Sequence, residues 1–166
     1  MKKTMLALTL STFTSISLAN SNYINMSYSN ISDVESDAYS ISFETVVDNI
    51  SLSLSAGVVD SAVVDDYSLW GVSGSVGLSS FEKGTFYARS SLSKISGTSE
   101  NILGIGYALI SSSQMSYDFA FLDIDTIDPT VSVTVRIPQD ESTGFTFGIA
   151  ASESQKQATI GISTSF

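Results

Sequence analysis

Ten segments of the chain alternate large apolar side chains with small polar ones, and this alternation constrains the fold more than any other feature. In the segment 158–166, for example, Ile160, Ile162 and Phe166 fall on one side, while Ser163 falls on the other. Successive side chains of a strand point to opposite faces, so each segment presents one apolar face and one face of Ser, Gly and Thr. The chain is therefore expected to be all β.

Clusters of turn-forming residues separate the ten segments, which marks each segment as a candidate strand. The strands are expected at residues 22–30, 38–47, 50–58, 67–79, 84–94, 102–111, 114–123, 130–137, 143–152 and 157–166. The two prolines, Pro129 and Pro138, lie at segment boundaries, where no ladder hydrogen bond is lost. An even number of strands lets both ends of a closed sheet emerge on the same side.

The polar faces decide between a soluble and a membrane-spanning architecture. A water-soluble sandwich exposes charged residues, but only 14% of this chain is charged, compared with about 25% in soluble domains. A transmembrane barrel turns apolar side chains to lipid and small polar ones inward, and its strands need about 9–11 residues. The sequence predicts a closed antiparallel up-and-down transmembrane β-barrel of about ten strands. Eight strands are the alternative count, and a soluble periplasmic β-sandwich is the alternative fold.

The start of the chain has the layout of a secretory signal peptide. Lys2 and Lys3 precede an uncharged run, and Ser17 and Ala19 occupy the small-residue positions before a cleavage site. We therefore expect residues 1–19 to be a signal peptide and residues 20–166 to form the barrel. The apolar run is too short and too rich in Ser and Thr to be a spanning helix.

The composition excludes several classes of function. The chain contains neither cysteine nor histidine, which excludes Ser-His-Asp sites, cysteine nucleophiles and histidine-based metal centres. Removal of the signal peptide leaves five basic residues against 17 acidic ones, a net charge of about −12. A chain this acidic repels nucleic acid. We expect no enzymatic activity, no cofactor and no nucleic-acid partner.

The signal peptide, the ten amphipathic strands and a last strand ending on Phe166 together resemble the small outer-membrane β-barrel proteins of Gram-negative bacteria. The resemblance covers the whole mature chain, but it is one of pattern, so it bears on fold and location more than on activity. It implies contact with outer-membrane lipid and lipopolysaccharide, and insertion by the barrel-assembly machinery. In that family a C-terminal aromatic residue belongs to the assembly signal, a role that here falls to Phe166. A monomer is expected, with the last strand closing on the first.

The connections predict an orientation. With the N-terminus in the periplasm, the outer connections are 31–37, 59–66, 95–101, 123–129 and 152–156, a somewhat longer and more acidic set than the periplasmic turns. Aromatic girdles are expected at both interfaces. We assign Tyr39, Tyr67 and Trp70 to the outer girdle, and Phe86, Met115, Tyr117, Phe145 and Phe166 to the periplasmic one.

Four charged residues fall on the inward faces: Glu44, Arg89, Asp118 and Arg136. All four are expected in the periplasmic half, with Asp118 and Arg136 close enough to pair diagonally on neighbouring strands. They either constrict a narrow pore, because charged rings tune selectivity, or simply neutralise one another inside a structural barrel. Tyr87, Arg89 and Arg136 are also large enough to plug a path of this width.

An acidic run in one outer connection is a second candidate site. Asp123, Asp125 and Asp128 supply carboxylate oxygens of the kind that bind calcium or magnesium. The run lacks the Gly and final Glu of a helix-loop-helix calcium site, and a solvated loop that keeps a sheet edge from aggregating is the favoured explanation.

The sequence thus predicts a non-enzymatic outer-membrane barrel, foremost a small porin-like passive pore for ions or small solutes. A structural or surface-interaction barrel without conductance is the alternative.

Overall fold

The computed structural model describes residues 21–32, 35–62, 65–95, 98–111, 115–124 and 127–166. The predicted signal peptide, residues 1–19, lies outside the described residues. Within the described ranges, no helix is long and apolar enough to cross a membrane.

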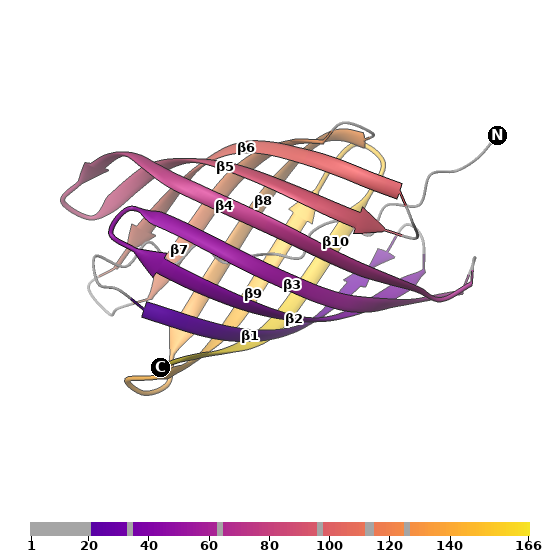
Figure 1. Ribbon diagram of the computed structural model, residues 1–166, viewed down its shortest axis with the longest axis horizontal. Helices are drawn as coiled ribbons and strands as arrows, with labels where there is room; N and C mark the ends of the chain where they lie inside the picture. Colours follow the sequence, from indigo (N-terminus) through magenta and orange to yellow (C-terminus); the bar gives the residue numbers. More distant parts are fainter. Residues whose placement is uncertain (1–20, 33–34, 63–64, 96–97, 112–114, 125–126) are drawn as a thin grey trace.

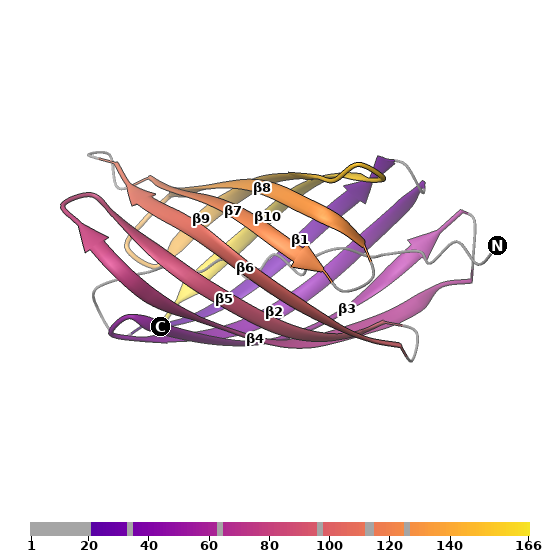
Figure 2. The same cartoon turned by 90° about the horizontal axis from the view of Figure 1, so that it is seen from above.

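Ten antiparallel strands form a closed barrel, as the sequence predicted (Figures 1 and 2). The strands are β1 (Ser21–Ile31), β2 (Ser36–Val47), β3 (Ile50–Ser61), β4 (Tyr67–Phe81), β5 (Gly84–Ile95), β6 (Thr98–Ile110), β7 (Ser116–Ile124), β8 (Ile127–Pro138), β9 (Thr143–Ala151) and β10 (Lys156–Ser165). Each strand pairs with its neighbours in sequence, and β1 pairs with β10 to close the barrel.

The two ends of the barrel differ in their connections. We call the end that holds Ser21 and Phe166 the inner end, and the opposite end the outer end. At the inner end, β2 and β3 are joined by a two-residue turn in which Asp48 has a φ of 54°, a conformation that Asp tolerates in tight hairpins.

Two outer connections are much shorter than predicted. β6 begins at Thr98 rather than at residue 102, and β8 begins at Ile127 rather than at residue 130. These strands continue because their first residues pair directly across the hairpin, Thr98 with Ile95 and Ile127 with Ile124. The expectation of a longer outer set is therefore wrong for these two connections.

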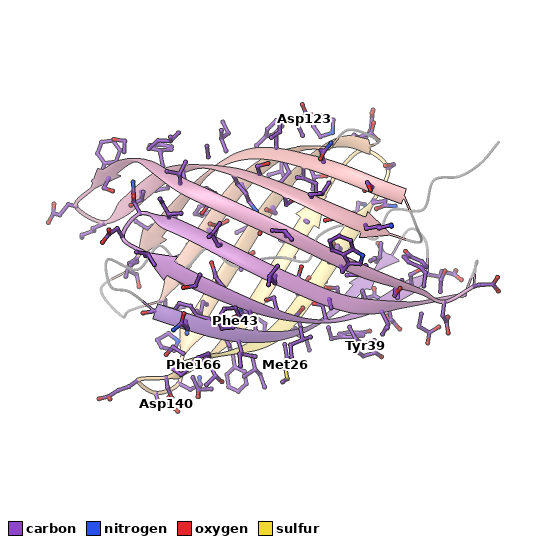
Figure 3. All side chains as sticks on the ribbon, viewed as in Figure 1. Met26, Tyr39, Phe43, Asp123, Asp140 and Phe166 are labelled. Atoms are coloured by element: carbon purple, nitrogen blue, oxygen red, sulfur yellow. The ribbon has the colours of Figure 1, made fainter. Side chains whose placement is uncertain are left out.

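The alternation separates an apolar exterior from a polar interior. On β3, Leu52 and Leu54 are more than half exposed, whereas Ser51 and Ser53 are buried. The same pattern of exposed apolar and buried polar side chains recurs around the barrel, and Figure 3 shows large side chains projecting outward from the ribbon. An apolar exterior is the surface that a barrel presents to lipid, and it excludes the soluble sandwich as the fold.

Aromatic side chains gather toward both ends of the exterior. Tyr28 and Tyr39 lie 5.3 Å apart between ring centroids toward the outer end, and Phe86 and Tyr107 lie 4.7 Å apart toward the inner end. Figure 3 shows Phe43 and Phe166 together, away from Tyr39. These positions fit the bands expected at the two faces of a membrane.

Tyr67, which was assigned to the outer girdle, faces the lumen instead of the membrane. Tyr67 points into the barrel, where it packs against Val59 and Leu69. Tyr67 and Trp70 are three positions apart on β4, so their side chains must fall on opposite faces, and Trp70 is the exposed one. In addition, Met115 precedes β7, which begins at Ser116.

Hydroxyl pairs connect neighbouring strands on the inner surface of the barrel. Ser27 pairs with Ser40 at 2.6 Å between β1 and β2, and Ser53 pairs with Ser73 at 3.1 Å between β3 and β4. Ser29 reaches Thr159 at 2.8 Å across the closing pair of strands. Away from lipid, these small polar side chains satisfy one another while leaving room in the lumen.

The turn between β8 and β9 generates a pH-dependent prediction. Asp140 Oδ1 accepts hydrogen bonds from the backbone N–H groups of Ser142 and Thr143 at 2.8 and 2.6 Å. These bonds hold the pKa of Asp140 below its usual range. A lowered pKa contributes stability above the unfolded-state value, near pH 4, and that contribution is lost as the pH falls through the lower folded-state value.

We therefore expect Asp140→Ala to lower the urea midpoint of the refolded barrel at pH 7, by an amount that shrinks as the pH falls below about 4. The control is Glu141→Ala, which removes the neighbouring exposed carboxylate. Equal deficits for Asp140→Ala at pH 7 and pH 3 would contradict the assignment.

Candidate functional site

Six inward side chains form one layer of the lumen near the inner end. The layer consists of Tyr23 on β1, Glu44 on β2, Tyr87 and Arg89 on β5, Asp118 on β7 and Arg136 on β8. Each lies within five residues of the inner end of its strand. Because every one of these strands turns its apolar face outward, the intervening positions must face inward. We refer to these six residues as the lumenal layer.

Glu44 interacts electrostatically with charges from the other side of the lumen. Its carboxylate is attracted by the guanidinium groups of Arg89 and Arg136 and repelled by the carboxylate of Asp118. β2 and β7 are five strands apart in either direction around the barrel, so this layer spans the lumen. Glu44 is only 1% exposed. Arg89, the Ser51 side chain and Arg136 favour its ionised form, whereas burial opposes it, because a buried charge is costly unless it is paired.

Tyr87 holds the second carboxylate of the layer. Its hydroxyl lies 2.8 and 2.7 Å from the two oxygens of Asp118, and its single proton is shared between them. Tyr87 is on β5 and Asp118 is on β7, so the ring must cross β6 to make this contact. It crosses at Gly106, where an added Cβ would overlap the end of the tyrosine ring. The glycine therefore provides room for Tyr87, not simply an open lumen.

The Arg136 side chain likewise runs along the inner surface of the barrel, over the neighbouring strand. Its side chain passes over Gly144 on β9, where an added Cβ would lie 3.0 Å from the guanidinium Nε. The guanidinium carbon then lies 4.9 Å from the centroid of the Tyr23 ring on β1. This is within the range of a cation–π interaction. The Nε atom is buried and has no hydrogen-bond partner within the described residues.

The structure brings the four predicted lumenal charges into one layer, and their role as a constriction remains a prediction. Asp118 accepts from Tyr87, and Arg136 lies over the ring of Tyr23. The predicted ion pair between Asp118 and Arg136 remains a prediction. Sequence analysis did not identify Tyr23. The available signal was its position two residues before the inward-facing Asn25, because alternate residues of a strand face the same side.

Sequence analysis also missed a fifth inward charge, Glu100. This residue is buried near the outer end of β6, close enough to Tyr67 to interact electrostatically. It was missed because the strand was expected to begin at residue 102. Its parity, shared with Gly104 and Gly106, was the signal that places it inside the barrel.

The acidic run in the predicted cation-binding loop is only partly described. Asp123 is exposed at the end of β7, on the outside of the barrel in Figure 3, and Asp128 is partly buried on β8. Asp125 lies outside the described residues. Among the residues that are described, no three acidic side chains are grouped to hold a metal ion. Cation binding by Asp123, Asp125 and Asp128 remains a prediction.

Phe166 lies at the inner edge of the barrel wall. Its side chain is 68% exposed, its ring centroid is 6.1 Å from that of Phe43, and its backbone N–H donates to Asn22 at 3.1 Å. The residue therefore continues the closing pair β1–β10. Its role as a membrane-assembly signal remains a prediction.

Three solved structures resemble this chain at low sequence identity. A KdgM porin is 11% identical, with 87% of this chain and 99% of that chain covered and a TM-score of 0.58. A de novo designed transmembrane β-barrel is 11% identical over 88% of this chain and 95% of its own, with a TM-score of 0.49. The N-terminal barrel domain of Pseudomonas aeruginosa OprF is 14% identical over 89% and 98%, with a TM-score of 0.47.

The match to the KdgM porin shows that this chain shares the β-barrel fold of that protein. It shows the fold alone, because the identity is very low. No protein-family profile matches the chain, and no curated sequence matches it.

The crossing at Gly106 generates a second prediction. Gly106→Ala places a methyl group where the Tyr87 ring now lies, so we expect Tyr87 to lose its contact with Asp118. Such overpacking costs about 1–3 kcal/mol, measured as a lower free energy of unfolding in urea. The control is Gly148→Ala, because the nearest atom to its added Cβ is the Thr134 hydroxyl at 3.3 Å. Equal effects of the two substitutions would refute this role for Gly106.

Proposed function

We propose that the chain is an integral protein of the bacterial outer membrane, exported with residues 1–19 as a signal peptide. The apolar exterior and the closed ring of hydrogen-bonded strands support this location, because a lipid-embedded chain must satisfy every backbone hydrogen bond internally. The aromatic bands at both ends of the barrel support it further.

Within that membrane, we propose a small porin-like pore for ions or small solutes, constricted by Glu44, Arg89, Asp118 and Arg136. The observation that carries this proposal is the inverted side-chain pattern of a ten-stranded barrel. The lumen is lined mainly by Ser, Gly and Thr, with the lumenal layer as its concentrated set of charges. An eight-stranded barrel is just filled by side chains, and the diameter grows with strand number, so ten strands leave more room.

A barrel without conductance is the second candidate, and one observation favours it. The lumenal layer sets two arginines beside two acidic side chains, and Tyr87 and Tyr23 each contact one member of this set. Glu44 is almost completely buried within the layer. A layer of side chains that contact one another across the lumen is also what a purely structural barrel needs.

Neither candidate is an enzyme in this proposal, because the chain lacks histidine and cysteine altogether.

The proposed partners are outer-membrane lipid, lipopolysaccharide and the barrel-assembly machinery, the last of which would recognise the strand that ends on Phe166. Divalent cations are proposed to bridge the outer aspartates to anionic headgroups. We propose a monomer, since apolar side chains are exposed on all sides of the barrel.

Single-channel recording distinguishes the two candidates. We expect the mature chain, refolded in detergent and added to a planar bilayer, to give discrete current steps. Arg136→Ser should change the step size or ion preference, because it removes a charge from the proposed constriction. The matched control is Lys83→Ser, which removes one positive charge from the exposed turn between β4 and β5.

A silent bilayer from protein that is folded, as judged by heat-modifiable migration on gels, would refute the pore and leave the structural barrel. Equal currents through the wild type, Arg136→Ser and Lys83→Ser would retain a pore but refute Arg136 as part of its constriction.

A further inference from the structure

We propose that five apolar side chains near the outer end of the lumen form a gate that limits the passage of ions. They come from β1, β3, β4, β6 and β7, and we call them the apolar collar: Ile31, Val59, Leu69, Ile102 and Leu122. This inference rests on the proposed pore and adds a second barrier to it, in series with the lumenal layer.

The collar residues lie inside the barrel, at its outer end. Each is at most 7% exposed, whereas apolar side chains on the opposite faces of the same strands are exposed. Each also lies within four residues of the outer end of its strand. The outer end of the lumen is therefore rich in apolar side chains, whereas its middle is lined mainly by Ser, Gly and Thr.

The collar side chains pack across neighbouring strands. Val59 and Leu69 form a buried cluster between β3 and β4. Leu69 also lies over Gly57 on β3, where an added Cβ would be 3.2 Å from the leucine Cδ1. Leu122 lies over Gly104 on β6, where an added Cβ would be 2.6 Å from the leucine Cδ2. The two leucines thus occupy space that glycine leaves open on the adjacent strand.

Three buried polar side chains share this end of the lumen. Gln157 donates to Thr159 at 3.3 Å, and Thr130 donates to the Asp128 carbonyl at 3.3 Å, so both bond along their own strands. The third is Glu100 on β6. Because Gln157, Thr130 and Glu100 are all buried, they provide no water-lined path beside the collar.

Burial of the collar is the observation that makes it a barrier. Side chains that line a water-filled space are exposed to that water, as Ser27, Ser55 and Ser132 partly are in the middle of the lumen. An ion that passes the collar must give up hydrating water among groups that offer no hydrogen bonds, which is costly. Apolar constrictions gate channels by excluding water. A polar residue in the collar should therefore admit water and ions.

Leu122→Asn tests the gate, because Asn is polar and has the branched shape of Leu. In a planar bilayer we expect it to raise the time-averaged current of a single barrel by about tenfold, since it lets water into the collar. Leu122→Met, the conservative variant, keeps the collar apolar and should retain the wild-type current. Ala120→Ser adds a hydroxyl on the same face of β7, two residues further from the outer end, and should leave the current unchanged.

Equal currents through the wild type and Leu122→Asn would overturn the gate and leave the pore intact. An equal rise in Leu122→Met would also overturn it, because the rise would then follow from loosened packing and not from polarity. If Leu122→Asn does not give a folded, heat-modifiable barrel, Val59→Thr adds a hydroxyl with the shape of Val and is held to the same criterion.

Labelling of an introduced thiol tests the collar without a current. The chain has no cysteine, so Ser132→Cys, which lies opposite Ala120 in the middle of the lumen, supplies a single thiol. We expect a charged methanethiosulfonate reagent to modify this thiol about tenfold faster in combination with Leu122→Asn than with Leu122→Met. Lys83→Cys, in the exposed turn between β4 and β5, should react at the same rate in both backgrounds.

The two measurements separate the gate from the pore. A folded wild type that is silent in bilayers would refute the pore, while faster labelling with Leu122→Asn would still support the collar as the seal of the lumen. Equal labelling rates in the two backgrounds would overturn the collar, whether or not the wild type conducts.

Discussion

The pairing of β1 with β10 is the interaction on which the rest of the structure depends. It runs from Tyr23 opposite Ser165 to Ile31 opposite Gln157, and it turns an open sheet into a closed barrel. In lipid an unpaired strand edge would leave a row of backbone N–H and C=O groups without partners, and each would cost several kcal/mol. Once the sheet is closed, the two faces are no longer equivalent. One must meet lipid and the other must line the lumen, and this is why the alternation in the sequence is so strict.

The lumen shows how small residues give space to large ones. Gly106 and Gly144 lie inside strands, where glycine weakens local structure. Each is crossed by a long side chain from an adjacent strand, Tyr87 in one case and Arg136 in the other. The loss of local strand preference is offset by contacts that connect β5 to β7 and β8 to β1. Glycine in these strands is thus part of how the charges are positioned.

The sequence was sufficient for the fold and insufficient for the contacts. Strand number, closure and the facing of most side chains followed from period-two alternation, because parity alone assigns a residue to the lumen or the lipid. The same alternation would have placed Tyr67 and Glu100 inside the barrel. Tyr67 was assigned to the exterior because the alternation was not applied to it, and Glu100 was missed because the strand was expected to begin too late. The partners of Asp118 and Arg136 could not be predicted in this way. They depend on the register of several strands and on which glycines allow a side chain to cross, and neither is a local property of the sequence.

The strand number links the fold to the chemistry of the lumen. In an eight-stranded barrel side chains fill the interior, whereas 16 or more strands leave a wide aqueous channel. Ten strands fall between these cases, and Glu44 on β2 interacts with Arg89, Arg136 and Asp118 from β5, β8 and β7. Opposite charges can therefore meet across the lumen, and Tyr87 and Tyr23 add contacts to Asp118 and Arg136 along the inner surface of the wall. The arrangement of charges is therefore a consequence of barrel size, and a change in strand number would alter it even if every lumenal residue were kept.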